Sequence, residues 1–288
     1  MHLTPLKPSI IPILCHGQEA VVRVPAGMAL ESPIELGLKK SDNNLPISLK
    51  IHAGKWSSAT VIIRLTGGSD EKKVELRLSV IAQENSELKV VEFQNLSLKT
   101  YYVARRKVEV KKNAAMEFIT FQIGSSSSDG VCDLSAKGAA VDVRCLQVAK
   151  GNQKHCSILN NYFVQSVNTA NIISKSIAMD EGVIETQGKI IIPKGINATA
   201  ADLKLHSLLL SRKAHVVATP ALEIASDDVN VSHSASVSNL DDEQLFYFAS
   251  RGVDPAEARR MMVKGFVGDI MERIEELKEL KEKIIKLI

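Results

Sequence analysis

Histidine and cysteine are few in this chain, with seven and four residues, and the most conspicuous group of side chains that could bind a metal ion lies in its last third. His233 stands between two serines, and Asp227-Asp228 comes shortly before it. Imidazole, carboxylate and hydroxyl groups would converge there if the strand that begins near Val229 closes the β-region. From local chemistry alone, the pattern favours a hydrogen-bonded histidine over a metal ligand.

The cysteines by themselves do not indicate a permanent metal centre. His155-Cys156 is an adjacent pair of soft ligands, but neighbouring side chains on a strand point to opposite faces. Unless the pair lies in a turn, both residues cannot reach one metal ion, so a structural role is favoured. Cys132 and Cys145 lie among small residues, where a free cysteine behaves as a small buried hydrophobe. The sequence has no Cys-x-x-Cys pair, which disfavours a zinc or ferredoxin-like site.

Motifs for the common nucleotide-binding and hydrolytic chemistries are absent from the sequence. It contains no Gly-x-x-x-x-Gly-Lys-[Ser/Thr], Gly-x-Gly-x-x-Gly, Gly-x-Ser-x-Gly or His-Glu-x-x-His pattern. We therefore expect a chain that binds no nucleotide and is not itself an enzyme. A net charge of +3 does not indicate nucleic-acid binding. The densest basic run, Arg105-Arg106-Lys107, is interpreted as a solvated strand edge.

Composition and apolar runs predict a protein of the reducing cytoplasm without membrane contact. No run approaches the roughly 18 consecutive apolar residues of a membrane span. The first residues lack the charged leader and cleavage site of a signal peptide. Four cysteines in 288 residues are too few for a disulfide framework.

Alternation of apolar and polar residues predicts a mainly β fold for the first four fifths of the chain. Residues 74–80 and 116–121 show this pattern clearly. Turn residues recur at short intervals, and no helix-length 3.6-residue pattern separates the strands, which disfavours a βαβ sheet. A sandwich, a barrel and a β-solenoid all remain open. From about residue 181, short strands with small residues between them favour the solenoid.

The pattern changes from strand to helix after Asn239. Gly252 can end one helix, and Asp254 and Pro255 can begin the next as N-cap and first helical residue. The apolar face of that second helix is expected to consist of Met261, Met262 and Phe266. We predict a β-domain of residues 1–238 and a helical domain of residues 239–288. The helices either lie on the β-domain, extend as a coiled coil, or dock a partner protein.

Several short motifs in the last hundred residues resemble one known family. They are residues 188–192 (GKIII), 208–211 (LLLS), 220–224 (PALEI), 227–229 followed by Ser232-His233, 240–247 (LDDEQLFY) and 250–252 (SRG). In this order and spacing they are similar to the SufB/SufD family, the scaffold subunits of an iron–sulfur cluster assembly machine. Upstream of residue 182 the likeness is only the general strand pattern.

The resemblance implies a right-handed parallel β-helix, followed by C-terminal helices that bind an ABC-type ATPase, SufC. Two scaffolds are expected to associate through their β-helices, with a transient cluster, expected to be 4Fe–4S, near their interface. His233 matches the interface histidine and is the expected metal ligand. Further cluster ligands, in falling order, would be Asp227, Asp228 and Cys156. The ATPase-binding residues would be Leu245, Phe246, Tyr247, Arg251, Met261, Met262 and Phe266.

The chain also departs from the family pattern. The position of the SufB scaffold cysteine is Ala214 here, and the glutamates that flank the SufB histidine are Ser232 and Ser234. The long glutamine-rich helical region of SufB is missing from the sequence. These departures favour a compact, SufD-like lone scaffold that forms a homodimer carrying two ATPases, as in the minimal two-component systems of archaea.

Two other functions remain open at this point. A SufD-like accessory subunit would share the fold and partner without binding a cluster itself. A carbohydrate-active β-helix enzyme would need aromatic side chains along a groove to stack on sugars, and Trp56 is the only tryptophan. The sequence therefore disfavours the carbohydrate enzyme.

Overall fold

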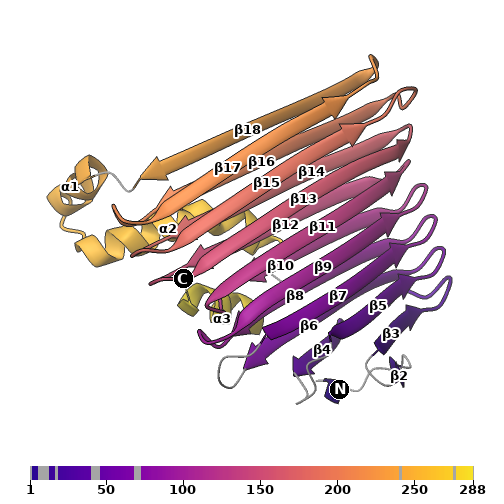
Figure 1. Cartoon of the computed structure of the whole chain (residues 1–288), viewed down its shortest axis with the longest axis horizontal. Helices are drawn as coiled ribbons and strands as arrows, with labels where there is room; N and C mark the ends of the chain where they lie inside the picture. The colour runs from indigo at the N-terminus through magenta and orange to yellow at the C-terminus, as the bar shows by residue number, and fades with distance from the viewer. Residues whose placement is uncertain are drawn as a thin grey trace.

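The chain forms a parallel β-solenoid followed by three helices (Figure 1). The computed structural model describes residues 2–5, 13–16, 19–39, 46–67, 73–239, 242–274 and 277–287. The strands form two nine-stranded sheets, A and B, and from β3 onward successive strands fall alternately into sheet B and sheet A. The predicted β-helix with a C-terminal helical module is confirmed. A sandwich is set aside because the strand ladders are parallel from β3 and β4 onward.

Sheet A contains every second strand of the solenoid. In spatial order its strands are β1 (His2–Pro5), β4 (Ile34–Lys39), β6 (Ser58–Gly67), β8 (Glu87–Leu96), β10 (Ala115–Gln122), β12 (Ala140–Ala149), β14 (Asn168–Ala178), β16 (Thr199–Leu209) and β18 (Val229–Asn239). Sheet B, in the reverse direction, contains β17 (His215–Ile224), β15 (Val183–Ile192), β13 (Lys154–Gln165), β11 (Ser127–Lys137), β9 (Tyr101–Val110), β7 (Lys73–Ala82), β5 (Ile47–Ala53), β3 (Glu19–Val24) and β2 (Ile13–His16).

The core lies between the two sheets and follows directly from the alternating sequence. Every second residue of each strand points inward, so that Leu76, Leu78 and Val80 of β7 are buried. Each inward residue stacks on the equivalent residue of the next strand in its sheet, as Leu49 does on Leu78. The core is therefore a set of ladders parallel to the solenoid axis.

One corner of the solenoid repeats a left-handed backbone conformation from turn to turn. Asn85 and Asn113 have φ of 58° and 57°, and Asn85 donates its N–H to the carbonyl of Lys112 at 3.1 Å. Asparagine tolerates this conformation, but Trp56 and Val167 adopt it at equivalent corners, where side chains are strained. Hydrogen bonding between successive corners therefore sets the turn, and residue type does so only in part.

The two ends of the solenoid differ. At the N-terminal end, the four-residue strands β1 and β2 pair antiparallel with β4 and β3. At the other end, β17 and β18 are the last strands of their sheets. Their inward side chains have no further turn to pack on, so Val216 and Val231 are only half-buried and Val237 is 49% exposed. We call this end the open end.

Three helices follow: α1 (Asp242–Ser250), α2 (Pro255–Glu272) and α3 (Lys278–Leu287). The predicted caps are confirmed. Asp254 accepts hydrogen bonds from the N–H groups of Ala256 and Glu257, and Gly252 has a φ of +77°. Among the described helices, none is long and apolar enough to cross a bilayer.

The helices cover part of the outer face of sheet A. A continuous apolar layer joins Ile119, Phe121 and Ile177 of the sheet to Val267 of α2 and Leu280 of α3. The division into domains of residues 1–238 and 239–288 stays a prediction, because this layer is shared by both parts.

Candidate functional site

His233 faces the solenoid axis at the open end. It pairs in register with Leu203 of β16, whose side chain is buried in the core, so the two side chains lie on the same, inward side of sheet A. No further turn covers β18, and His233 is exposed. Ser232 points to the opposite face, where its hydroxyl lies 2.7 Å from Asp202 Oδ1. The histidine is therefore accessible to anything that docks on the open end.

The other proposed cluster ligands lie elsewhere in the chain. Asp227 and Asp228 are exposed in the turn before β18, and the Asp228 carbonyl accepts a hydrogen bond from Ala198 at 2.9 Å. Five residues of extended strand separate Asp228 from His233, a distance of roughly 16 Å. Cys156 lies on the outer face of sheet B, on β13. Across the described ranges, no three histidine, cysteine or acidic residues come close enough together to hold a metal ion.

The pair His155-Cys156 is split between the two faces of sheet B, as the strand geometry predicts. His155 is buried inside the solenoid, with Nδ1 2.8 Å from the Ser128 hydroxyl oxygen. Burial lowers the pKa of His155 to about 4. Cys156 is half-buried on the outside between Asp129 and Glu185, and burial and these carboxylates raise the pKa of its thiol.

A buried ion pair inside the solenoid was missed by sequence reasoning. The expectation that the run Arg105-Arg106-Lys107 forms a solvated edge is wrong for its middle residue. Arg106 stacks between Leu78 and Cys132 on a core ladder and binds the carboxylate of Glu92 across the interior. The alternation of the strand held the signal, because Arg106 is in phase with the buried residues of β9.

Glu92 also accepts a hydrogen bond from the phenol of Tyr102 at 2.9 Å. Burial and the neighbouring carboxylate raise the pKa of Tyr102, which keeps the phenol protonated as a donor. Burial opposes the charge of Arg106, but Glu92 raises its pKa and keeps the guanidinium charged. The interior of this β-solenoid is thus partly ionic, although most of its core is aliphatic.

The thiols of Cys132 and Cys145 lie beside this ion pair. Their burial confirms the prediction that both are small buried residues. Cys132 and Cys145 line a cavity of about 20 Å³, roughly the space of one water molecule, together with Arg106 and Gln147. Burial raises the pKa of Cys132 to about 12 and also raises that of Cys145. Both thiols are therefore protonated at neutral pH and are poor nucleophiles in this state.

The predicted partner-binding residues divide into an exposed set and a packed set. Phe246, Tyr247 and Met261 are 74%, 58% and 47% exposed, and the Arg251 guanidinium lies 5.2 Å from the centre of the Tyr247 ring. Met262 and Phe266 are half-buried, and the side chain of Leu245 lies outside the described residues. We call Phe246, Tyr247, Arg251 and Met261 the helical patch.

The expected apolar face of α2 is wrong in part. The residues of α2 that are buried are Ala258, Val263, Val267, Ile270 and Met271, whereas Met261 points away from the sheet. The buried face of α2 is therefore rotated about the helix axis relative to the face that contains Met261 and Phe266. This leaves Met261 free for another surface.

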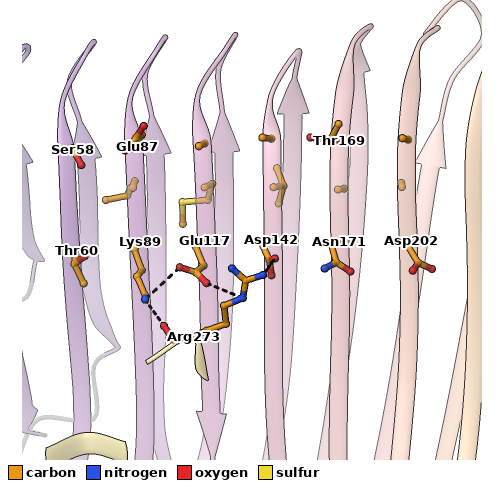
Figure 2. A pocket seen from close by; sticks show the side chains of 18 of the residues that line it. Ser58, Thr60, Glu87, Lys89, Glu117, Asp142, Thr169, Asn171, Asp202 and Arg273 are labelled. Carbon is orange, nitrogen blue, oxygen red and sulfur yellow. Dashed lines mark hydrogen bonds and ion pairs between the residues drawn. The ribbon is translucent and has the colours of Figure 1, made fainter. Parts of the chain in front are cut away.

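A groove of about 700 Å³ runs over the outer face of sheet A, next to the end of α2 (Figure 2). Its floor contains the small side chains Ala115, Ala140 and Ala200. Ala115 of β10 and Ala140 of β12 are neighbours in register, and Ala200 of β16 lies two strands further along the same row. A row of polar residues borders it, one from each strand in register: Thr60, Lys89, Glu117, Asp142, Asn171, Asp202 and Ser232. Arg273 extends from the end of α2 into this row.

The comparison with known proteins identifies the family. A family profile described as SUF system FeS cluster assembly, SufBD core domain, matches residues 39–266. The chain belongs to the SufB/SufD family. An iron–sulfur cluster assembly SufBD family protein of Mycobacterium bovis is 30% identical over 199 residues, which are 68% of this chain and 24% of that protein.

Two further relatives of the SufB/SufD family come from Bacillus subtilis. Its iron–sulfur cluster assembly protein SufB is 23% identical over 256 residues, covering 85% of this chain and 54% of the relative. Its SufD is 25% identical over 282 residues, covering 93% of this chain and 63% of the relative. The chain thus spans about a quarter of the mycobacterial protein. It spans 54% of the Bacillus SufB and 63% of the Bacillus SufD.

Within this SufB/SufD-family fold, the position that resembles the SufB cysteine carries no ligand. Ala214 precedes β17 and is buried against Ala149, Ala178 and Ile184 in a small apolar cluster. A methyl group cannot replace a thiolate as a metal ligand. The open end of one chain therefore presents His233 without a cysteine partner at that position.

Proposed function

We propose that this protein is a scaffold subunit for iron–sulfur cluster assembly, which binds a SufC-like ABC ATPase and holds a transient cluster where two scaffolds meet. The carrying observation is the position of His233. It belongs to a SufB/SufD-family chain and lies exposed on the inward side of sheet A at the open end, where none of the described residues forms a further turn over it. The cluster is cargo in this proposal, and few protein ligands favour its release to an acceptor. The scaffold acts in the cytoplasm and is not itself an enzyme.

The helical patch is the proposed ATPase-docking surface. Exposed aromatic residues and arginine are the residue types that contribute most to protein–protein binding. The ring of Tyr247 is held by Arg251 on one side and by the edge of Phe248, whose centroid lies 6.2 Å away. Such pre-ordered rings lose little conformational freedom on binding.

The open end is the proposed interface between two copies. β17 and β18 leave an unpaired backbone edge in each sheet, and natural proteins normally cover such long edges. In a two-fold dimer each copy would contribute the same surface, including one His233. Asp227 and Asp228 lie at the rim of this surface and remain candidate ligands after His233.

Co-purification tests the ATPase partner. The chain would be co-expressed with a SufC-like ATPase, and the complex captured under gentle conditions. We expect Phe246→Glu to abolish capture, because it replaces the most exposed aromatic side chain of the helical patch with a charge. Leu98→Glu is the matched control, since Leu98 is 66% exposed in a turn far from α1 in sequence. Failure of the wild-type chain to capture the ATPase would count against the docking proposal.

Anaerobic reconstitution tests the cluster site. We expect the wild-type chain to gain iron, sulfide and the visible absorption of a cluster, and His233→Ala to lose most of this signal. His215→Ala is the control, because His215 is an exposed histidine at the start of β17. An unchanged signal in His233→Ala would remove His233 from the ligand set.

A second candidate function is a SufD-like accessory subunit that binds the ATPase without holding a cluster. The burial of Ala214 in an apolar cluster favours it. The same reconstitution separates the two functions, because an accessory subunit would capture the ATPase but gain no cluster alone.

A further inference from the structure

The C-terminal half of α2 is attached to sheet A by charged contacts along one flank of its apolar stripe. Lys175 of β14 lies 2.6 Å from Asp269 Oδ1 and donates to the Phe266 carbonyl at 2.5 Å. Arg144 of β12 lies 3.8 Å from Asp269 Oδ2. The side chains of Lys175 and Arg144 are only 12% and 5% exposed, whereas Asp269 is 41% exposed.

Arg273, one turn further along the same flank, binds the row of polar residues at the groove. Its Nη2 lies 3.3 Å from Asp142 Oδ2, and its Nε lies 3.9 Å from Glu117 Oε1. Lys89 donates to the carbonyl of Arg273 and lies 3.4 Å from Glu117 (Figure 2). Two lysines of the sheet therefore bind carbonyls of the second half of α2 and its cap. The carbonyl that Lys89 binds belongs to the C-cap residue, where the helix dipole is negative.

The helical patch lies at the opposite end of the same helical module. In α1 and the first half of α2, most described side chains are exposed, and the buried residues in that half of α2 are Ala258 and Val263. The other buried residues of α2, namely Val267, Ile270 and Met271, belong to its second half. A partner bound at the helical patch would therefore act on the less buried half of α2, while the other half is attached to sheet A.

We propose that Asp269, Arg273 and their partners on sheet A form a releasable ionic clasp, which fixes the position of α2 and opens when a partner binds the helical patch. An apolar stripe alone lets a helix slide, because such contacts have little directionality. The ion pairs fix its position, yet each has one solvent-exposed member and is weakened by salt and by competing charges. The groove beside Arg273 provides space for the released end, with Asp202 as a further acceptor in the same row.

The opening step rests on the proposed ATPase partner, but the clasp itself can be tested without it. Amide hydrogen exchange would be followed in the full-length chain at low salt and in about 0.5 M salt. Asp269→Asn should raise exchange in residues 263–272 roughly three- to tenfold at low salt and remove most of its salt dependence. Glu257→Gln is the matched control, since the Glu257 carboxylate pairs with Arg260 of the same helix.

Equal exchange in Asp269→Asn and Glu257→Gln would overturn the clasp, and so would salt-independent exchange in the wild-type chain. Arg273→Gln, which should reproduce the effect from the groove side, guards against a local folding defect at Asp269. In a second arm, the affinity for a SufC-like ATPase is measured. Asp269→Asn should bind several-fold more tightly, because no clasp has to open. Unchanged affinity would overturn the coupling, whereas absence of wild-type binding would overturn the proposed function and leave the clasp result standing.

Discussion

Arg106 and Glu92 form a two-point ion pair inside the solenoid, with Arg106 Nε 2.7 Å from Glu92 Oε2 and Nη2 2.5 Å from Oε1. Both side chains are almost fully buried, at 7% and 1% exposure. They come from opposite sheets, Glu92 from β8 and Arg106 from β9, so the pair ties the two walls of one turn together.

Removing one member of this pair should be far worse than removing both. We expect Arg106→Met to lower the free energy of unfolding by about 3–5 kcal/mol, because it leaves the Glu92 carboxylate buried without its counter-charge. The double variant Arg106→Met with Glu92→Gln should recover much of that loss. Urea unfolding of the three proteins measures the difference, and Arg77→Met, at an exposed pair with Glu75, is the control. A double variant as unstable as the single one would contradict the electrostatic explanation.

The stability of the fold should fall between pH 6.5 and pH 4 because of His155. Its pKa is lowered from 6.5 to about 4 by burial, so the unfolded chain takes up a proton at a higher pH than the folded chain. Stability is therefore complete above pH 6.5, declines as pH falls through this window, and levels off below about 4, with a total loss of about 3 kcal/mol from this group. His155→Gln should flatten that part of the pH profile measured by denaturant unfolding. A profile with the same slope in the variant would assign the pH dependence to other groups.

Thiol reactivity should separate the cysteines by their position in the solenoid. In a Cys15→Ser background, Cys156 on the outer face should react with a maleimide or disulfide reagent before Cys132 and Cys145. Burial raises the pKa of all three thiols, but only Cys156 has access to solvent. Mass spectrometry of the labelled protein at neutral pH would identify the modified residue. Early labelling of Cys132 would show that the interior opens on the timescale of the reaction.

Two glycine substitutions should have opposite effects on stability. A methyl group at Gly182 would lie 2.6 Å from the Ala149 carbonyl oxygen, a backbone atom that cannot move aside, so Gly182→Ala should destabilise the solenoid by several kcal/mol. Gly265 lies within α2 with open space around it, and Gly265→Ala should stabilise the protein by about 0.5–1 kcal/mol through helix propensity. Thermal unfolding of both variants beside the wild type tests this. Destabilisation by Gly265→Ala would indicate that α2 approaches another surface there.

The sequence predicted the strands and the caps of the helices because both depend on local chemistry. Alternation places Leu76 and Leu78 inward, and Asp254 caps α2 whatever that helix packs against. The solenoid itself was less evident, since its turns vary in length and its corners accept Trp56 and Val167 in a conformation usually left to glycine or asparagine.

The sequence predicted individual residues of the candidate site but not how they are arranged relative to one another. The inward direction of His233 depends on its register with Leu203, and the burial of Arg106 depends on Glu92 of another strand. The alternation of β9 puts Arg106 in phase with the buried residues, but neither its pairing with Glu92 nor the register of His233 has a short-range signal in the sequence. The buried stripe of α2 likewise depends on the shape of sheet A, which selects Val263 and Val267 over Met261.

The contrast between the ends of the solenoid sets a limit on the size of any assembly. β1 and β2 reverse the strand direction and are four residues long, while β17 and β18 present edges of 10 and 11 residues. In the proposed dimer, two chains that meet end to end use up each other's long free edges. Assembly through these edges would then stop at two chains and would not continue into a filament.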